Sequence, residues 1–257
     1  MKIGVCCGDN VERMKIAKAI GYDYVESNSG DIVKADDELF NQMKNAGIPI
    51  LSSNCFIGHR IVGPEKDEKK IREYTQKLFE RAKELGIKIL VFGSSGARKY
   101  KEEPGTSIES CREEITEFLC NIVAPLAEKY EIQIAIEPLR PGECNVINHI
   151  AQGVEIAKKV NSPYVKVLAD LMHMRLGDEP LSEIDKYSEW LIHAHTSNPD
   201  GDGEHRRTYP KAGDKFNQDD FMLPIMNAGV EMCSVEADVI DFEQDAKEAF
   251  EILKKYR

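Results

Sequence analysis

Residues 132–170 read IQIAIEPLRPGECNVINHIAQGVEIAKKVNSPYVKVLAD. The stretch begins and ends with short runs rich in β-branched residues, IQIAIEP (132–138) and YVKVLAD (164–170), which are typical of buried strands. Between them, residues 148–160 carry apolar side chains at helical spacing. A strand, a helix and a second strand in this order predict one unit of a parallel α/β sheet.

The same alternation runs through the whole chain. Strand-like runs occur at eight places: 3–7, 24–28, 49–55, 88–94, 132–138, 164–170, 191–197 and 231–238. Each is followed by a helical pattern, at 11–20, 36–46, 65–85, 107–130, 148–160, 181–190, 217–228 and 241–256. Eight alternations in 257 residues predict a (β/α)8 barrel, also called a TIM barrel. No linker or low-complexity tract interrupts the pattern, so residues 1–257 are expected to form a single domain.

A doubly wound open sheet is the alternative, since it shows the same alternation. That fold has fewer strands and often carries a glycine-rich phosphate-binding turn after its first strand. Here the turn reads CCGDNVE (6–12), which lacks that pattern. The barrel is therefore the favoured fold.

Composition limits the partners and the compartment. Lys and Arg number 34 and Asp and Glu 45, which gives a formal net charge of −11, so neither nucleic acid nor an acidic membrane is expected to bind. The longest apolar runs, such as KILVFG (88–93), have only the length of a strand. Seven cysteines without paired spacing suggest no disulfide framework and indicate a reducing cytoplasm. The basic run ARKYK (97–101) is expected to be a solvated loop, with contact to a substrate phosphate as the alternative.

Four strand ends in the second half of the chain carry typical metal ligands. In a (β/α)8 barrel the active site forms at the C-terminal ends of the strands. The residues at these strand ends are Glu137, Asp170, His195 and Glu236. Any one of them alone is more simply an ordinary polar residue, but three converging carboxylates repel one another unless a cation neutralises them. We therefore expect a divalent ion, with Mn²⁺ preferred, Mg²⁺ or Co²⁺ as substitutes, and Zn²⁺ left open.

Other polar residues are placed near this site by the same reasoning. His193 lies two residues before His195 and points to the same side of its strand, one layer deeper. We expect it behind the site or in the core. Glu26, Asn54 and Phe56, at the second and third strands, are candidates for lining the other half of the pocket.

At these residues the sequence resembles the xylose isomerase-like TIM barrel superfamily of sugar isomerases and epimerases, with the ketose 3-epimerases as the nearest branch. The resemblance covers nearly the whole chain. The motifs that carry it are IEPLRPGECNVINHIAQGVEIAKKV (136–160), LADLMHM (168–174), IHAHTS (192–197), EHRRTYPKAGD (204–214) and CSVEAD (233–238).

The resemblance implies a reaction and roles for further residues. The metal would chelate vicinal oxygens of a sugar, while Glu137 and Glu236 move a proton beside the carbonyl. Glu143, His173 and Arg207 would bind the substrate. Proton return to the opposite face of the same carbon gives an epimerase, and return to the neighbouring carbon gives an aldose–ketose isomerase.

The position of the arginine and the reaction type stay open. Arg206 is the alternative to Arg207. The segment after Glu236 lacks the Met-Gly-Gly-type sequence associated with ketose 3-epimerases, and the loop after His195 is longer than theirs. An inosose dehydratase, a hydroxypyruvate-type isomerase and a catalytically silent sugar-binding barrel are the alternatives.

An apurinic endonuclease of the same superfamily is disfavoured. The motif IGHR (57–60) resembles one site of those enzymes, but Gly93 stands where they carry a ligand histidine, and the negative charge opposes DNA binding. The expected partner is a small sugar or sugar-derived molecule, and the motifs do not settle whether the chain forms a homo-oligomer.

Overall fold

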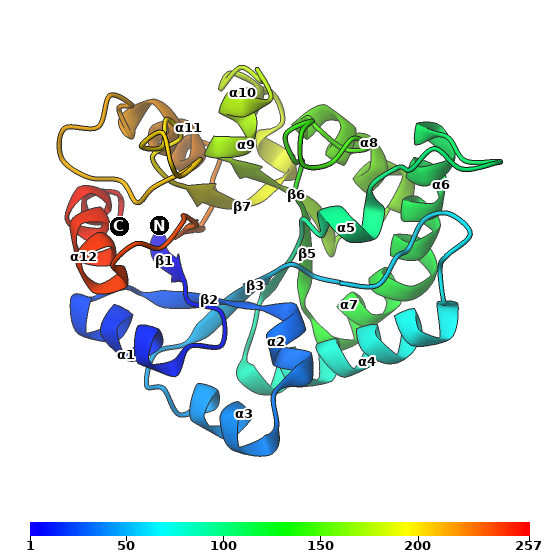
Figure 1. Ribbon diagram of the computed structural model, residues 1–257, viewed down its shortest axis with the longest axis horizontal. Coiled ribbons are helices and arrows are strands. Elements are labelled where there is room, and N and C mark those ends of the chain that lie inside the picture. The colour runs from blue at the N-terminus through cyan, green and yellow to red at the C-terminus, as the bar shows by residue number, and fades with distance from the viewer.

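The computed structural model describes all 257 residues. Eight parallel strands close into a barrel and follow one another around it in chain order (Figure 1). They are β1 (Lys2–Cys6), β2 (Tyr24–Asn28), β3 (Ile50–Asn54), β4 (Ile89–Phe92), β5 (Gln133–Ile136), β6 (Val165–Asp170), β7 (Leu191–Thr196) and β8 (Met232–Val235). Pairing between β1 and β8 closes the ring.

Helices cover the outside of the barrel, and α1 and α12, from opposite ends of the chain, lie side by side (Figure 1). The α-helices are α1 (Val11–Ile20), α2 (Ser29–Lys34), α3 (Asp37–Lys44), α4 (Glu68–Leu85), α5 (Ser95–Arg98), α6 (Ile108–Phe118), α7 (Ala124–Tyr130), α8 (Ile150–Val160), α9 (Leu171–Leu176), α10 (Glu183–Lys186), α11 (Asp219–Asn227) and α12 (Phe242–Leu253). A π-helical turn, Leu119–Val123, joins α6 to α7, and 3-10 turns span Ser188–Trp190 and Lys254–Tyr256. The (β/α)8 prediction is confirmed.

The sequence pattern does not predict three short helices. The helices α2, α5 and α9 have six, four and six residues, too few turns to show an apolar period. Two of them start at a side chain that ends a strand. Asn28 accepts hydrogen bonds from the backbone of Gly30 and Asp31, and Asp170 accepts one from His173. Such caps stabilise a helix at the first residue after the strand.

Side chains close the barrel beneath its C-terminal end. A small apolar cluster, separate from the main core, contains residues of β2, β4, β5, β6 and β8: Tyr24, Ile89, Val91, Ala135, Leu168 and Met232. The Tyr24 ring lies so close to Gly4 that a Cβ atom there would approach it to 2.3 Å. The Tyr24 hydroxyl shares a hydrogen bond of 2.8 Å with Ser234 Oγ. Because side chains alternate along a strand, Glu26 lies on the same inner face, one layer above Tyr24.

The remaining global expectations concern membranes and cysteines. None of the helices combines the length and apolar character that crossing a bilayer requires. All seven cysteines are free.

Phe56 is wholly buried against the rings of Phe79, Phe92 and Phe118, so the expectation that it lines the pocket is wrong.

Candidate metal centre

The four side chains at the second-half strand ends lie together. Glu137 follows β5 directly, Asp170 ends β6, His195 belongs to β7, and Glu236 follows β8. One ligand atom from each lies within 4.8 Å of the others. The barrel thus brings together residues up to 99 positions apart in the sequence, because the carboxyl ends of its strands meet at one mouth.

One nitrogen of His195 faces all three carboxylates. Its Nδ1 atom lies 3.1 Å from Glu137 Oε1, 2.9 Å from Glu236 Oε2 and 3.6 Å from Asp170 Oδ2. Three hard oxygen donors around one imidazole nitrogen form a set that suits a divalent cation such as Mn²⁺, Mg²⁺ or Zn²⁺. The residues present therefore fit the metal that the sequence predicts.

The charges around these carboxylates differ. Arg207 Nη1 lies 3.1 Å from Asp170 Oδ2 and 3.0 Å from Glu236 Oε2. Burial opposes the ionisation of Glu236, but Arg207 and His195 outweigh it and lower its pKa to about 2. Burial likewise opposes the ionisation of Asp170, yet the neighbouring His173, His195 and Arg207 hold its pKa well below the usual range. Glu137 has no such arginine, and burial raises its pKa.

Two of the three expected substrate-binding residues lie beside this cluster. Arg207 contacts two of the carboxylates, whereas its neighbour Arg206 is exposed. His173 is buried, its backbone N–H donates to Asp170 Oδ1, and its Nδ1 accepts a hydrogen bond of 3.3 Å from the backbone N–H of Arg140. Glu143 is half-buried and pairs with Arg140 at 3.5 Å, outside the ligand cluster.

The first half of the barrel contributes contacts that the sequence only outlined. Asn54 Nδ2 donates to Glu236 Oε1 at 3.1 Å. Glu26 and His193 are fully buried below the ligands, and His193 lies behind the site as expected. His59 packs edge-to-face against Tyr74 and does not join the ligand cluster.

Arg98 contradicts the expectation of a solvated basic loop. Its side chain is fully buried and donates a hydrogen bond of 2.8 Å to the Phe92 carbonyl and another to the carbonyl of Glu137. It thereby ties the end of β4 to the residue that supplies the first ligand. The run ARKYK gives no sign of this, because an arginine beside lysines is more often exposed.

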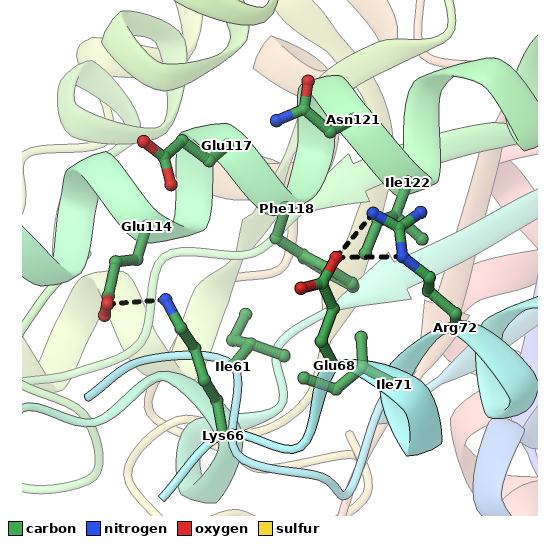
Figure 2. Close-up of a pocket in the computed structure, with 10 residues that line it drawn as sticks. All are labelled: Ile61, Lys66, Glu68, Ile71, Arg72, Glu114, Glu117, Phe118, Asn121 and Ile122. Atoms are coloured by element: carbon green, nitrogen blue, oxygen red, sulfur yellow. Dashed lines mark hydrogen bonds and ion pairs between the residues drawn. The ribbon is translucent and has the colours of Figure 1, made fainter. Parts of the chain in front are cut away.

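A separate cavity of about 130 Å³ lies on the outer wall, between α4 and α6 (Figure 2). Its two basic side chains are already paired, Lys66 with Glu114 at 2.8 Å and Arg72 with Glu68 at 2.7 Å. None of the predicted site residues lines it.

Comparison with known proteins agrees with this architecture. Residues 14–256 match the model of the family described as xylose isomerase-like TIM barrel. No curated protein sequence matches the chain significantly. Many solved structures share the fold, and three of them show the degree of likeness. D-Psicose 3-epimerase from Clostridium cellulolyticum H10, crystallised with D-tagatose, is 19% identical, with coverage of 100% of this chain and 99% of that one and a TM-score of 0.83.

The other two structures are about as similar to this chain. The 3-keto-D-glucoside 4-epimerase of E. coli is 18% identical over 99% of both chains, with a TM-score of 0.80. The IolI protein with a bound zinc atom is 20% identical over 100% of this chain and 99% of its own, with a TM-score of 0.76. Because the family model spans nearly the whole chain, the protein belongs to the xylose isomerase-like TIM barrel family.

Proposed function

We propose that this protein is a divalent-metal-dependent sugar isomerase or epimerase, similar in action to the ketose 3-epimerases, that moves a proton on a carbon next to a carbonyl. The observation that carries the proposal is the convergence of Glu137 and Glu236, from β5 and β8, on His195 Nδ1 together with Asp170. The similarity to structures of D-psicose 3-epimerase and L-ribulose 3-epimerase supports it.

Glu137, Asp170, His195 and Glu236 would hold the ion, for which Mn²⁺ is our first choice. The ion would supply a Lewis acid that orients two neighbouring sugar oxygens and polarises the carbonyl. The two glutamates reach the site from different strands. One can therefore remove a proton from one face of the reacting carbon while the acid form of the other returns a proton to the opposite face.

Three side chains are proposed to position the sugar. Because the backbone N–H of Arg140 can only donate, His173 Nδ1 must accept, and the neutral ring then carries its proton on Nε2. That N–H would donate to a sugar oxygen. Arg207 offers further N–H groups beside the two carboxylates that it contacts, and Glu143 would accept from a hydroxyl at the edge of the pocket.

Ketoglucosides belong among the candidate substrates as well as free ketoses, given the likeness to 3-keto-D-glucoside 4-epimerase. The inosose dehydratases and hydroxypyruvate-type isomerases of the family remain the alternative assignment, since the same chemistry starts their reactions. We further propose a cytoplasmic location, which the seven free cysteines fit.

The proposal is tested by incubating the metal-stripped protein with candidate sugars in the presence and in the absence of Mn²⁺. The sugars are D-psicose, D-fructose, D-tagatose, L-ribulose and 3-ketoglucosides. The products are then separated by chromatography. Asp170→Asn is the matched variant, because an asparagine still caps α9 and leaves both glutamates intact. We expect Mn²⁺-dependent conversion of at least one sugar, lost in Asp170→Asn. Conversion that persists without metal, or in the variant, would contradict the proposal.

A further inference from the structure

A buried carboxylate lies directly behind the candidate metal centre. Glu26 of β2 is 0% exposed and accepts hydrogen bonds at both oxygens. Its Oε1 atom lies 2.9 Å from Nε2 of His195. Around Oε2 lie Ser52 Oγ at 2.6 Å, Ser234 Oγ at 2.7 Å and His193 Nε2 at 2.9 Å. A fully buried carboxylate needs such donors, because burying a charge without them is costly.

Carboxylates face both ring nitrogens of His195, Glu26 on the Nε2 side and the proposed metal ligands on the Nδ1 side. A carboxylate oxygen only accepts, so His195 Nε2 carries its proton toward Glu26. Nδ1 faces Glu137, Asp170 and Glu236, and an ion held by these carboxylates would take the place of a proton on that nitrogen. We infer that Glu26 is a positioning residue whose negative charge orients the His195 ring and strengthens Nδ1 as a ligand for the metal, an inference that rests on the proposed metal centre.

The surroundings of Glu26 prevent it from rotating. Its partners come from β3, β7 and β8, so four strands hold one carboxylate. Ser234 is itself bonded to the Tyr24 hydroxyl. The two ring nitrogens of His193 face the carbonyl of Met232 at 3.0 Å and Oε2 of Glu26 at 2.9 Å. Glu26 is thus fixed in place before any ligand arrives.

Glu26 supports a proposed metal ligand and is not one of the ligands itself. Glu26, His193 and His195 could in principle hold an ion of their own. However, each facing pair of atoms already lies at hydrogen-bond distance, and Oε2 also accepts from the hydroxyls of Ser52 and Ser234. A carboxylate that bonds the far nitrogen of a metal-binding histidine is the usual support for such a ligand, and its loss typically weakens metal binding about 10- to 100-fold.

Glu26→Gln is the variant that tests the inference. Its amide oxygen can still accept from His195 Nε2, and the two N–H groups of its amide can donate to the hydroxyl oxygens of Ser52 and Ser234. The shape and most of the hydrogen bonds are therefore retained while the charge is lost. Ser52→Ala is the matched control, because it removes one donor to Oε2 without touching His195. Zn²⁺ and Mn²⁺ affinities are measured by competition with a chromophoric chelator, and folding is checked by circular dichroism.

We expect Glu26→Gln to bind Zn²⁺ about 10- to 100-fold more weakly than the wild type, and Ser52→Ala to stay within about threefold of it. Asp170→Asn is included to separate the two claims. If Asp170→Asn weakens binding and Glu26→Gln does not, the inference fails and the proposed centre stands. If neither variant weakens binding, the metal centre itself is misplaced.

A spectroscopic reading does not depend on any variant folding. Long-range ¹H–¹⁵N NMR of the wild-type protein loaded with Zn²⁺ reports which ring nitrogen carries a proton. We expect His195 to keep its proton on Nε2, with the Nδ1 resonance shifted by the metal. A proton on Nδ1, or a shift by zinc at Nε2, would overturn the inference. Neither measurement requires a substrate, so the outcome is independent of the sugar chemistry.

Discussion

A Cβ atom built on Gly93 would lie 2.1 Å from Oε2 of Glu137. Gly93 directly follows β4, and the absence of a side chain there leaves the space that the Glu137 carboxylate occupies. A larger residue at this position, such as the histidine expected of an apurinic endonuclease, would take that space. The glycine therefore matters for the orientation of the first proposed ligand.

Gly93→Ala is expected to weaken metal binding, because the added methyl group forces the Glu137 carboxylate out of the cluster. We predict a loss of Mn²⁺ affinity of about tenfold or more, measured by chelator competition. Gly96→Ala is the control, since a Cβ atom at Gly96 meets nothing within 4 Å. Equal affinities of the two variants would show that Glu137 does not need this position.

Asn54→Ala is expected to slow turnover. Its amide donates to Glu236 Oε1, so the variant loses one donor that holds a proposed proton carrier. A hydrogen bond to a charged group contributes about 1.5–3 kcal/mol, which predicts a fall in kcat of about 10- to 100-fold with little change in KM. Steady-state kinetics on the responding sugar provides the measurement. Unchanged kcat would mean that Asn54 does not serve the reaction.

Arg98→Met is expected to destabilise the fold. The variant fills similar space but leaves the buried carbonyl of Glu137 without its donor and the carbonyl of Phe92 with only the backbone N–H of Glu137. We predict a loss of about 3 kcal/mol in the free energy of unfolding, measured by urea denaturation. The neighbouring Lys99 is exposed, and Lys99→Ala should change that free energy by less than about 0.5 kcal/mol. A similar small change in Arg98→Met would refute a structural role for the arginine.

Glu179 gives the stability a pH dependence. Burial raises its pKa from 4.5 to about 7, although Ile150 donates a backbone hydrogen bond to it. The folded state therefore binds the proton more tightly than the unfolded state, so this contribution to stability is present below about pH 4.5 and is lost as the pH rises toward 7. Glu179→Gln, which stays neutral, should gain in Tm relative to the wild type between about pH 5 and 8.

The control for this pH dependence is Glu155→Gln, which alters an exposed glutamate on α8. Its Tm difference from the wild type should change less over the same range. A Tm difference for Glu179→Gln that does not vary with pH would contradict the account.

The sequence predicts the eight strands and the four converging ligands for a physical reason. Buried parallel strands are short apolar runs. Once eight of them alternate with helices, their carboxyl ends must meet at one mouth, and Asp170 and the other three ligands stand at these ends. Contacts across the barrel could not be predicted in this way. Glu26 and His195 are 169 residues apart, and their hydrogen bond depends on the register and side-chain layers of strands β2 and β7.

The burial of Arg98 escaped prediction for a different reason. Whether a basic side chain turns inward depends on backbone carbonyls that are placed to accept from it, here those of Phe92 and Glu137. No spacing of residues encodes that. Gly93 is similar, since the sequence shows a missing histidine, whereas only the structure shows which carboxylate uses the space.

The central claim is that the two glutamates move a proton beside a carbonyl with the help of a bound metal. Its most direct test is solvent exchange, followed by NMR in D₂O, with metal-free protein repleted with Mn²⁺ and a panel of ketoses, aldoses, ketose phosphates, ketoglucosides and inososes. Glu236→Gln is the control variant. We predict deuterium at a single carbon of at least one compound, dependent on Mn²⁺ and lost in the variant. Bound Mn²⁺ with no label in any compound, or label that persists in Glu236→Gln, would contradict the claim.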